Sequence, residues 1–373
     1  MKRSANIFTK KLSVKGAVIK WTVAAALCLT AGGVLIAARC SQAFADWFCF
    51  NVYPVFSGIG AHIWGLLPLS AGEIFVALVI LGVLAGIVFL IIHVKRHKGH
   101  RVLALLGGLS WAGITAAALF LLVTFNCLVG YSRTPFSSYS GLTLREYSAE
   151  ELRVLAVYMI EEANRCAEQV ELDGEGRPVK PDNFSQLAVD AMSALAEDYP
   201  VLDTYYPQPK AVLASPVMSN FNLAGIYFPV TVEANYNQAM PVSSQGFTAC
   251  HELSHLSGFI REDEANFIAF IACRESGDPY LRYSGYLGAL TYTMNAYYSV
   301  ADREDYGELY LSICETIREE FACRSSYWAQ YEKKATFQAA TAVNDAYLKA
   351  NNQTDGTRSY GRVVDLLLAE YYK

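Results

Sequence analysis

The sequence lacks several features that define common protein classes. It has no excess of basic residues, since its 373 residues carry a formal net charge of −5, so we do not expect a nucleic-acid partner. Its nine cysteines include no CxxC pair of the metal-binding kind, and their pairing cannot be read from spacing. We expect each of them to be a small apolar core residue. Charge of either sign is scarce, at 17% of the chain against 53% hydrophobic residues, which is more apolar than a typical soluble protein.

The apolar residues are concentrated in the first 130 positions. A membrane-spanning helix needs about 20 mostly apolar residues, and three segments meet this length: 17–38, 74–92 and 102–130. The first contains Lys20 near its end, where the side chain can extend to the interface, and the other two carry no charge. We therefore expect a multi-pass membrane protein, with a membrane domain over 1–130, a polar linker over 131–147 and a second domain over 148–373.

Lysine and arginine placement predicts the orientation. Basic residues precede the first span (Lys2, Arg3, Lys10, Lys11 and Lys15) and fill the link between the second and third (Lys95, Arg96, Lys98 and Arg101). The link over 39–73 has only one lysine or arginine, Arg39, at its start. We therefore expect the N-terminus in the cytoplasm and everything after Gly130 outside. The "AFA" at 43–45 resembles a signal peptidase site, but the apolar stretch is long for a signal peptide, so we expect a retained anchor.

The second domain has mainly helical signals. Ser148 and Glu151 have the spacing of a capping box, which predicts a helix to about residue 170, and a second helix is expected over 185–197 after a loop at 173–183. Segment 225–237 is aromatic and β-branched with a proline inside, which predicts an edge strand or bulged hairpin. From Ser243 the pattern is helical to the end, with breaks near Gly258, 277–279, 301–302 and 351–356. The domain should be mainly α with a small β element.

One segment carries residues suited to metal chemistry: "ACHELSHLSGFIREDEANF", residues 249–267. His251 and His255 are four residues apart, so they share a helical face and both imidazoles can reach one ion. Zinc suits this pair because it binds neutral imidazole and lowers the pKa of bound water to about 7. Glu252 lies about 60° round the helix from His255, where it could act as general base. The alternative is a helix with two solvent-facing histidines and a charged end.

A catalytic zinc site usually has a third protein ligand. The domain has no further histidine, because the remaining four all precede residue 101, so the ligand should be a carboxylate. Gly258 can end the helix in a left-handed turn and bring back Glu262, Asp263 or Glu264. These acids could instead simply stabilise a helix N-terminus. Glu262 and Glu264 would lie about 200° apart on a helix, so both cannot face one ion.

The motif resembles the gluzincin-type zincin metallopeptidases, in which HExxH is followed by a glutamate on a later helix, often within E-x-x-A-D or E-x-x-A-N. Residues 262–266 fit this pattern with Glu262 in the ligand position, so the resemblance implies that His251, His255 and Glu262 bind Zn²⁺ and Glu252 is the base. The spacing after His255 is shorter than in most gluzincins. It is closer to the metzincin pattern HExxHxxGxxH, with Arg261 in place of the third histidine. The layout also resembles an uncharacterised family of bacterial membrane proteins with three N-terminal spans and this motif.

We therefore expect a bacterial membrane-anchored zinc metallopeptidase, with an extracytoplasmic, zincin-like domain that acts on peptide or protein substrates. Strand 225–235 could align the substrate or could be an ordinary structural hairpin. A tyrosine or arginine would have to stabilise the oxyanion, and Tyr360 is one candidate. The main alternative is a non-catalytic envelope sensor or scaffold with a degenerate metal site. An intramembrane protease is disfavoured because the motif lies about 120 residues beyond the last span. Nothing in the sequence indicates an oligomeric state.

Overall fold

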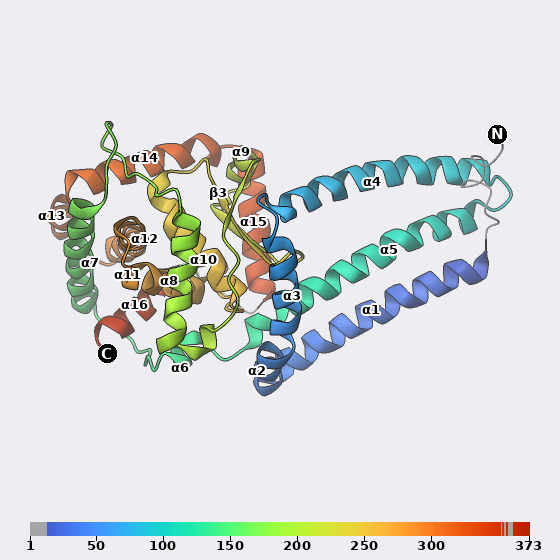
Figure 1. Ribbon diagram of the computed structural model, residues 1–373, viewed down its shortest axis with the longest axis horizontal. Coiled ribbons are helices and arrows are strands. Elements are labelled where there is room, and N and C mark those ends of the chain that lie inside the picture. The colour runs from blue at the N-terminus through green and yellow to red at the C-terminus, as the bar shows by residue number, and fades with distance from the viewer. Residues whose placement is uncertain (1–12, 352, 354–355, 357–360) are drawn as a thin grey trace.

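Three long helices extend from a mainly helical domain (Figure 1). The computed structural model describes residues 13–351, 353, 356 and 361–373. The long helices are α1 (Val14–Cys40), α4 (Ala71–Arg96) and α5 (Arg101–Asn126), and each is long and apolar enough to cross a membrane. The prediction of a mostly helical protein with three candidate membrane-spanning helices is confirmed. Four of the basic residues used to predict the orientation, Lys2, Arg3, Lys10 and Lys11, lie outside the described residues.

The α1 and α5 helices pack against each other through small side chains. Every seventh residue of α1 is a buried alanine: Ala17, Ala24, Ala31 and Ala38. The buried residues of α5 are also small or polar: Ala104, Ser110, Ala117, Thr124 and Asn126. A seven-residue repeat keeps side chains on one face of a helix, and small residues allow close backbone approach where lipid removes the hydrophobic driving force. In α4 the buried residues are Ala71 and Gly72, so most of that helix is free to face lipid.

Two short helices connect α1 to α4: α2 (Gln42–Asn51) and α3 (Tyr53–Gly65). They lie across the boundary between the long helices and the domain (Figure 1). Their outward sides expose large apolar side chains: Trp47, Phe50, Val55, Phe56, Ile59, Ile63 and Trp64. Aromatic residues in such a position are typical of a membrane interface. The segment that resembles a cleavage site, 43–45, is part of α2, and Ala45 in it is fully buried.

The expected polar linker is instead packed into the domain. Segment 131–147 overlaps a 3₁₀ helix, η1 (Leu128–Ser132), and contains the short helix α6 (Phe136–Tyr139). Phe136 is fully buried and its ring contacts those of Phe259 and Phe267. The polar composition of the segment predicts an exposed linker. The segment is packed because burial of one large aromatic side chain, Phe136, stabilises it more than its exposed polar neighbours destabilise it.

Helices form most of the domain. The predicted capping box begins α7 (Ala149–Gln169): Ser148 Oγ accepts a hydrogen bond from the Glu151 N–H at 3.2 Å, and Glu151 Oε2 accepts one from the Ser148 N–H at 2.8 Å. The other helices are α8 (Phe184–Asp198), α9 (Ser215–Asn220), α10 (Val242–Leu256), α11 (Glu262–Glu275), α12 (Pro279–Tyr298), α13 (Arg303–Leu311), α14 (Glu315–Glu332), α15 (Ala335–Ala350) and α16 (Val363–Tyr371), with a 3₁₀ turn, η2 (Pro200–Leu202). Breaks at 312–314 and 333–334 add to those expected.

A three-stranded sheet precedes α10. The expected hairpin is present: β2 (Gly225–Phe228) pairs antiparallel with β3 (Glu233–Asn237), and the proline lies in the connection. The third strand, β1 (Lys210–Val212), pairs parallel with the other side of β3, so β2 is an edge strand. The sequence did not predict β1, because three residues are too few to show an alternating pattern.

The sheet is joined to the start of α4 by buried charges. Lys210 Nζ lies 2.5 Å from Glu233 Oε1, and both side chains are buried. The Glu233 carboxylate also accepts the N–H groups of Ala71 and Gly72 at 3.1 and 2.7 Å. These N–H groups belong to the first turn of α4, where a helix has no internal acceptors and favours negative charge. One glutamate therefore links the sheet to a long apolar helix.

The other long helices also contact the domain. Asn126, at the end of α5, donates from Nδ2 to the Pro229 carbonyl at 2.8 Å, and its own carbonyl accepts from the Tyr227 hydroxyl at 3.0 Å. Arg39, near the end of α1, donates to the Ala350 carbonyl at the end of α15 at 3.0 Å. The domain is therefore attached at all three helices.

All nine cysteines are free. Five are buried, as expected for small apolar residues: Cys49, Cys127, Cys166, Cys250 and Cys273. The expectation is wrong for three that are exposed, Cys28, Cys40 and Cys323. Cys28 and Cys40 lie on α1, whose outward face has no protein partner among the described residues, so a span residue can be apolar without being inside the protein core.

Candidate metal centre

The α10 helix presents His251, Glu252 and His255, and a tight turn returns the chain to them. Gly258 follows the end of α10 with φ of +90°, a conformation that side chains with a Cβ rarely adopt. Its N–H donates to the His255 carbonyl at 2.9 Å. After three more residues α11 begins at Glu262. The left-handed turn expected at Gly258 is present, and it places the first residue of α11 beside the histidines.

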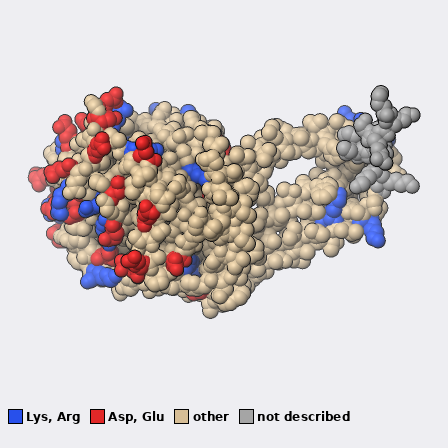
Figure 2. All heavy atoms as spheres, viewed as in Figure 1, with Lys and Arg blue, Asp and Glu red and all other residues tan. Residues whose placement is uncertain are grey.

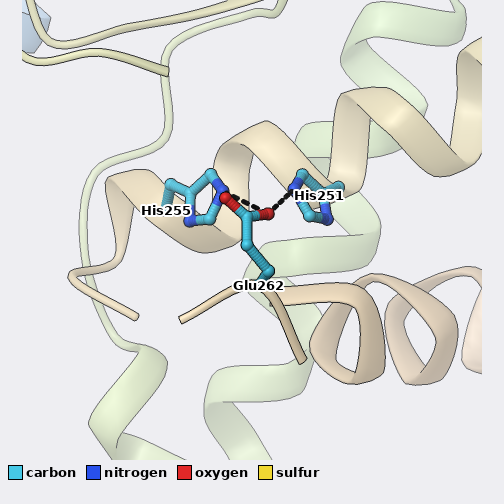
Figure 3. Close-up of side chains that lie close together, drawn as sticks. All are labelled: His251, His255 and Glu262. Carbon is cyan, nitrogen blue, oxygen red and sulfur yellow. Dashed lines mark ion pairs between the residues drawn. The ribbon is translucent and has the colours of Figure 1, made fainter. Parts of the chain in front are cut away.

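Three side chains meet at this turn (Figure 3). One carboxylate oxygen of Glu262 lies 3.2 Å from His251 Nε2 and 3.6 Å from His255 Nε2. One donor atom from each of the three residues lies within 4.8 Å of the others. Ligands bound to zinc at 2.0–2.1 Å in a tetrahedron are separated by about 3.4 Å. The two imidazole–carboxylate distances therefore correspond to edges of such a coordination sphere.

The histidine tautomers bear on metal binding. His255 Nδ1 lies 2.9 Å from the Phe259 carbonyl oxygen, so Nδ1 carries the proton and donates it. In the neutral imidazole the lone pair is then on Nε2, the atom that faces Glu262. A metal-bound histidine usually donates its second ring nitrogen in this way. His251 Nδ1 is buried and has no hydrogen-bond partner among the described residues, so only His255 has a protein group that fixes its tautomer.

The pKa values of the pair reflect the same contacts. Burial alone would raise the pKa of Glu262, but His255 and His251 outweigh it and hold that pKa well below its usual range. Burial alone would lower the pKa of His255, but the Glu262 carboxylate raises it to about 9. Each group is therefore strongly stabilised by the opposite charge. A divalent cation at the same point would replace the proton as the positive partner of Glu262.

Glu252 is held in a separate position. It is buried, with 5% of its surface exposed, and the backbone N–H of Tyr227 donates to its carboxylate. Burial raises its pKa, while His251 and His255 oppose the rise. The start of β2 passes directly over it, and a Cβ at Gly225 would collide with the carboxylate. A glycine is therefore required for the strand to lie this close to Glu252.

The other two acids in the first turn of α11, Asp263 and Glu264, face away from the histidines. Glu264 accepts the buried N–H of Phe136 at 3.1 Å and pairs with Arg261 at 3.3 Å, and burial raises its pKa to about 7. Burial also raises the pKa of Asp263, against the arginines at 362 and 261. The structure thus brings Glu262, and not Glu264 or Asp263, to the histidines. Glu264 instead fixes the position of α6.

A cavity of about 450 Å³ contains the cluster. Parts of α5, β2, α10, α11, α12, α14 and α15 line it, and Glu252 and the three clustered residues are among its walls. The sequence missed several other polar or aromatic lining residues: Tyr292, Arg324, Trp328 and Tyr347. They lie on helices far along the chain, and no local pattern distinguishes them from ordinary packing residues. Tyr360, the earlier candidate, lies outside the described residues.

Comparison with known proteins identifies a family. A family model described as a protein of unknown function (DUF3810) matches residues 48–368. The chain belongs to this family. The matched region of this DUF3810 protein runs from α2 to α16 and includes every residue of the cluster. No curated protein and no solved structure matches the chain. The chemistry of the DUF3810 protein must therefore be argued from its own side chains.

Proposed function

We propose that this DUF3810 protein is a membrane-anchored zinc metallopeptidase of a bacterial cell membrane, with its catalytic domain outside the cytoplasm. The observation that carries the proposal is the meeting of His251, His255 and Glu262 in a cavity that also contains Glu252. Two imidazole nitrogens and one carboxylate oxygen are the donor set of many catalytic zinc sites, which keep a further position open. The cluster is on α10 and α11, outside the candidate membrane spans.

Each residue then has a distinct role. Zinc bound here would supply a Lewis acid and lower the pKa of a water molecule. His251, His255 and Glu262 would hold it. Glu252 would take a proton from the attacking water and deliver it to the leaving amine. Burial raises its pKa above the usual value for a glutamate, which is the direction in which catalytic carboxylates are commonly shifted.

The cavity also offers places for a peptide and for developing negative charge. The edge strand β2 pairs with β3 on one side only, and Gly225, Ile226 and Tyr227 of this strand line the cavity. An extended peptide can add to such an edge by main-chain hydrogen bonds. The Tyr292 hydroxyl donates to Asn266 Oδ1 at 3.4 Å in the same cavity. Burial raises its pKa, so it stays protonated and can donate to an oxyanion.

The charge distribution supports the proposed orientation. Lysines and arginines gather at the end of the three long helices that is remote from the domain (Figure 2). They include Lys15, Lys95, Arg96, Lys98 and Arg101. Because cytoplasmic ends of membrane helices are enriched in basic residues, the domain should lie on the opposite side.

The test is zinc content and peptide hydrolysis of the full-length chain in detergent. The wild-type protein should bind about one zinc per chain and cleave members of a peptide library. The Glu252→Gln variant should keep the zinc and lose hydrolysis by on the order of 10²-fold or more. Loss of zinc from this variant would refute the role of Glu252. A wild-type protein that holds zinc without cleaving any peptide would instead favour a non-catalytic envelope sensor or scaffold.

A further inference from the structure

Arg324 introduces a positive charge into the cavity. It lies on α14 and lines the same space as the histidine–glutamate cluster. Its Nη1 donates to the neutral Thr291 hydroxyl at 3.1 Å. Among the described residues, no carboxylate forms an ion pair with it. A guanidinium stays charged near neutral pH and offers five N–H donors. The hydrogen bond to Thr291 uses one of these donors, so the others can bind a ligand.

The surroundings make this charge unfavourable in the protein alone. Burial lowers the pKa of Arg324, and the group that raises it is the Tyr292 phenol, which is neutral at ordinary pH. A partly buried charge without a charged partner costs free energy. Such a cost is typical of a binding site, where a ligand supplies the missing partner, because strained or uncompensated groups cluster at such sites.

Arg324 is also near the proposed chemistry. The Tyr292 pKa is affected by both Arg324 and Glu262, so the guanidinium and the cluster have the same tyrosine as a neighbour. Glu262 cannot compensate Arg324, since its carboxylate faces the two histidines. Trp328, one turn further along α14, lines the cavity next to Arg324 and adds an apolar surface. A short peptide could therefore reach both regions at once.

We propose that Arg324 binds a carboxylate of the peptide substrate, either its C-terminus or an acidic side chain close to the cleaved bond. A guanidinium matches a carboxylate with two parallel hydrogen bonds. This inference rests on the proposed function for the identity of the ligand as a peptide. The binding site itself does not require that the peptide be cleaved.

The experiment measures hydrolysis of matched acetylated tetrapeptides by the full-length, zinc-loaded chain. The sequence is fixed, and the peptide has a free C-terminus, an amide C-terminus, or an amide C-terminus with Asp in place of a neutral residue. The wild-type kcat/KM should be about 10- to 100-fold higher for a carboxylate-bearing form, the range of a charged hydrogen-bonded contact. Preference for the free C-terminus or for the Asp peptide identifies the source of the carboxylate.

Variants of Arg324 test whether this residue causes the preference for carboxylate-bearing peptides. Arg324→Gln should reduce the ratio between charged and neutral peptides to about one, and Arg324→Lys should keep part of it, since lysine retains the charge but not the planar fork. Arg318→Gln, on the same helix and outside the cavity lining, should keep the full ratio. Zinc content and the unfolding temperature of each variant show that it is folded. A ratio that survives in Arg324→Gln overturns the inference.

Binding separates this inference from the proposed function. Affinity for the same peptides is measured by fluorescence anisotropy in two chains: the Glu252→Gln variant and the double variant that also contains Arg324→Gln. A carboxylate preference in binding that depends on Arg324, together with a wild-type chain that cleaves none of the peptides, supports the anion site and contradicts the peptidase. Cleavage without any carboxylate preference supports the peptidase and refutes the anion site. Absence of both cleavage and peptide binding refutes both.

Discussion

Two glutamates on the first turn of α11 differ in what they contact. Glu262 faces His251 and His255, whereas Glu264 accepts the Phe136 N–H. The difference follows from helical geometry, because residues two apart point about 200° away from each other. The tight turn at Gly258 decides which of them faces α10.

Substitution should separate the two roles. Glu262→Ala should weaken zinc binding by more than about 100-fold, beyond the loss typical of groups that only support a ligand. Glu264→Ala should retain zinc affinity but leave the Phe136 N–H buried without an acceptor, which lowers the free energy of unfolding by about 1–3 kcal/mol. Competition with a fluorescent chelator measures the first effect, and thermal unfolding in detergent measures the second. Unchanged zinc affinity in Glu262→Ala, with a collapse in Glu264→Ala, would refute the assignment.

Residues near each other in the sequence were the easier ones to predict. His251, Glu252 and His255 follow from the helical repeat, and Glu262 follows from one glycine turn. The hydrogen bond from the Phe136 N–H to Glu264 was not predictable, because the two residues are 128 positions apart in the sequence. Arg324 and Tyr292 join the cavity through the packing of α12 and α14, which sequence spacing does not encode.

At the level of elements, the capping box of α7 makes a pH-dependent contribution. Arg145 and the Ser148 N–H hold the pKa of Glu151 at about 2, below its ordinary value of 4.5. A lowered pKa means that the folded chain binds the proton less tightly than the unfolded chain. The stabilisation is therefore present above about pH 4.5 and is lost as the pH falls through about 2.

Glu151→Gln should consequently unfold at a lower temperature than the wild-type protein at pH 7, because it loses the charged contacts to Arg145 and Ser148. The difference should narrow as the pH falls from 4.5 toward 2. Circular dichroism of the detergent-solubilised chain during heating measures it. Glu150→Gln, a neighbouring exposed change outside the capping box, should have a smaller effect. A Glu151→Gln difference as wide at pH 2 as at pH 7 would contradict this account.

Elements with a local signature were predicted, and those that depend on distant contacts were not. The helix after Ser148 and the hairpin around Pro229 have such signatures, a cap and a strand interrupted by proline. The strand at Lys210 exists because β3 pairs with it, and the 131–147 segment is ordered because Phe136 enters the core. In both cases the deciding partner is far along the chain.

At the level of the whole molecule, the basic end of the three long helices predicts the topology. A reporter enzyme that is active only outside the cytoplasm should be active when fused after Lys373. The same reporter fused at Lys98, in the basic link between α4 and α5, should be inactive. A cytoplasm-specific reporter at the same two positions serves as the control and should give the opposite result. Activity of the external reporter at Lys98 would overturn the orientation.

The attachment of the domain to all three long helices limits how the molecule can move. Glu233 joins the sheet to α4, Asn126 joins α5 to the β2–β3 hairpin, and Arg39 joins α1 to the end of α15. A domain tethered by one linker could swing away from the bilayer, but three separate attachments oppose that motion. If α1, α4 and α5 cross a bilayer, we expect the cavity to stay at a constant distance from the membrane surface. For a substrate that is itself anchored in the bilayer, we expect such a fixed distance to favour segments at the matching distance from the substrate's own anchor.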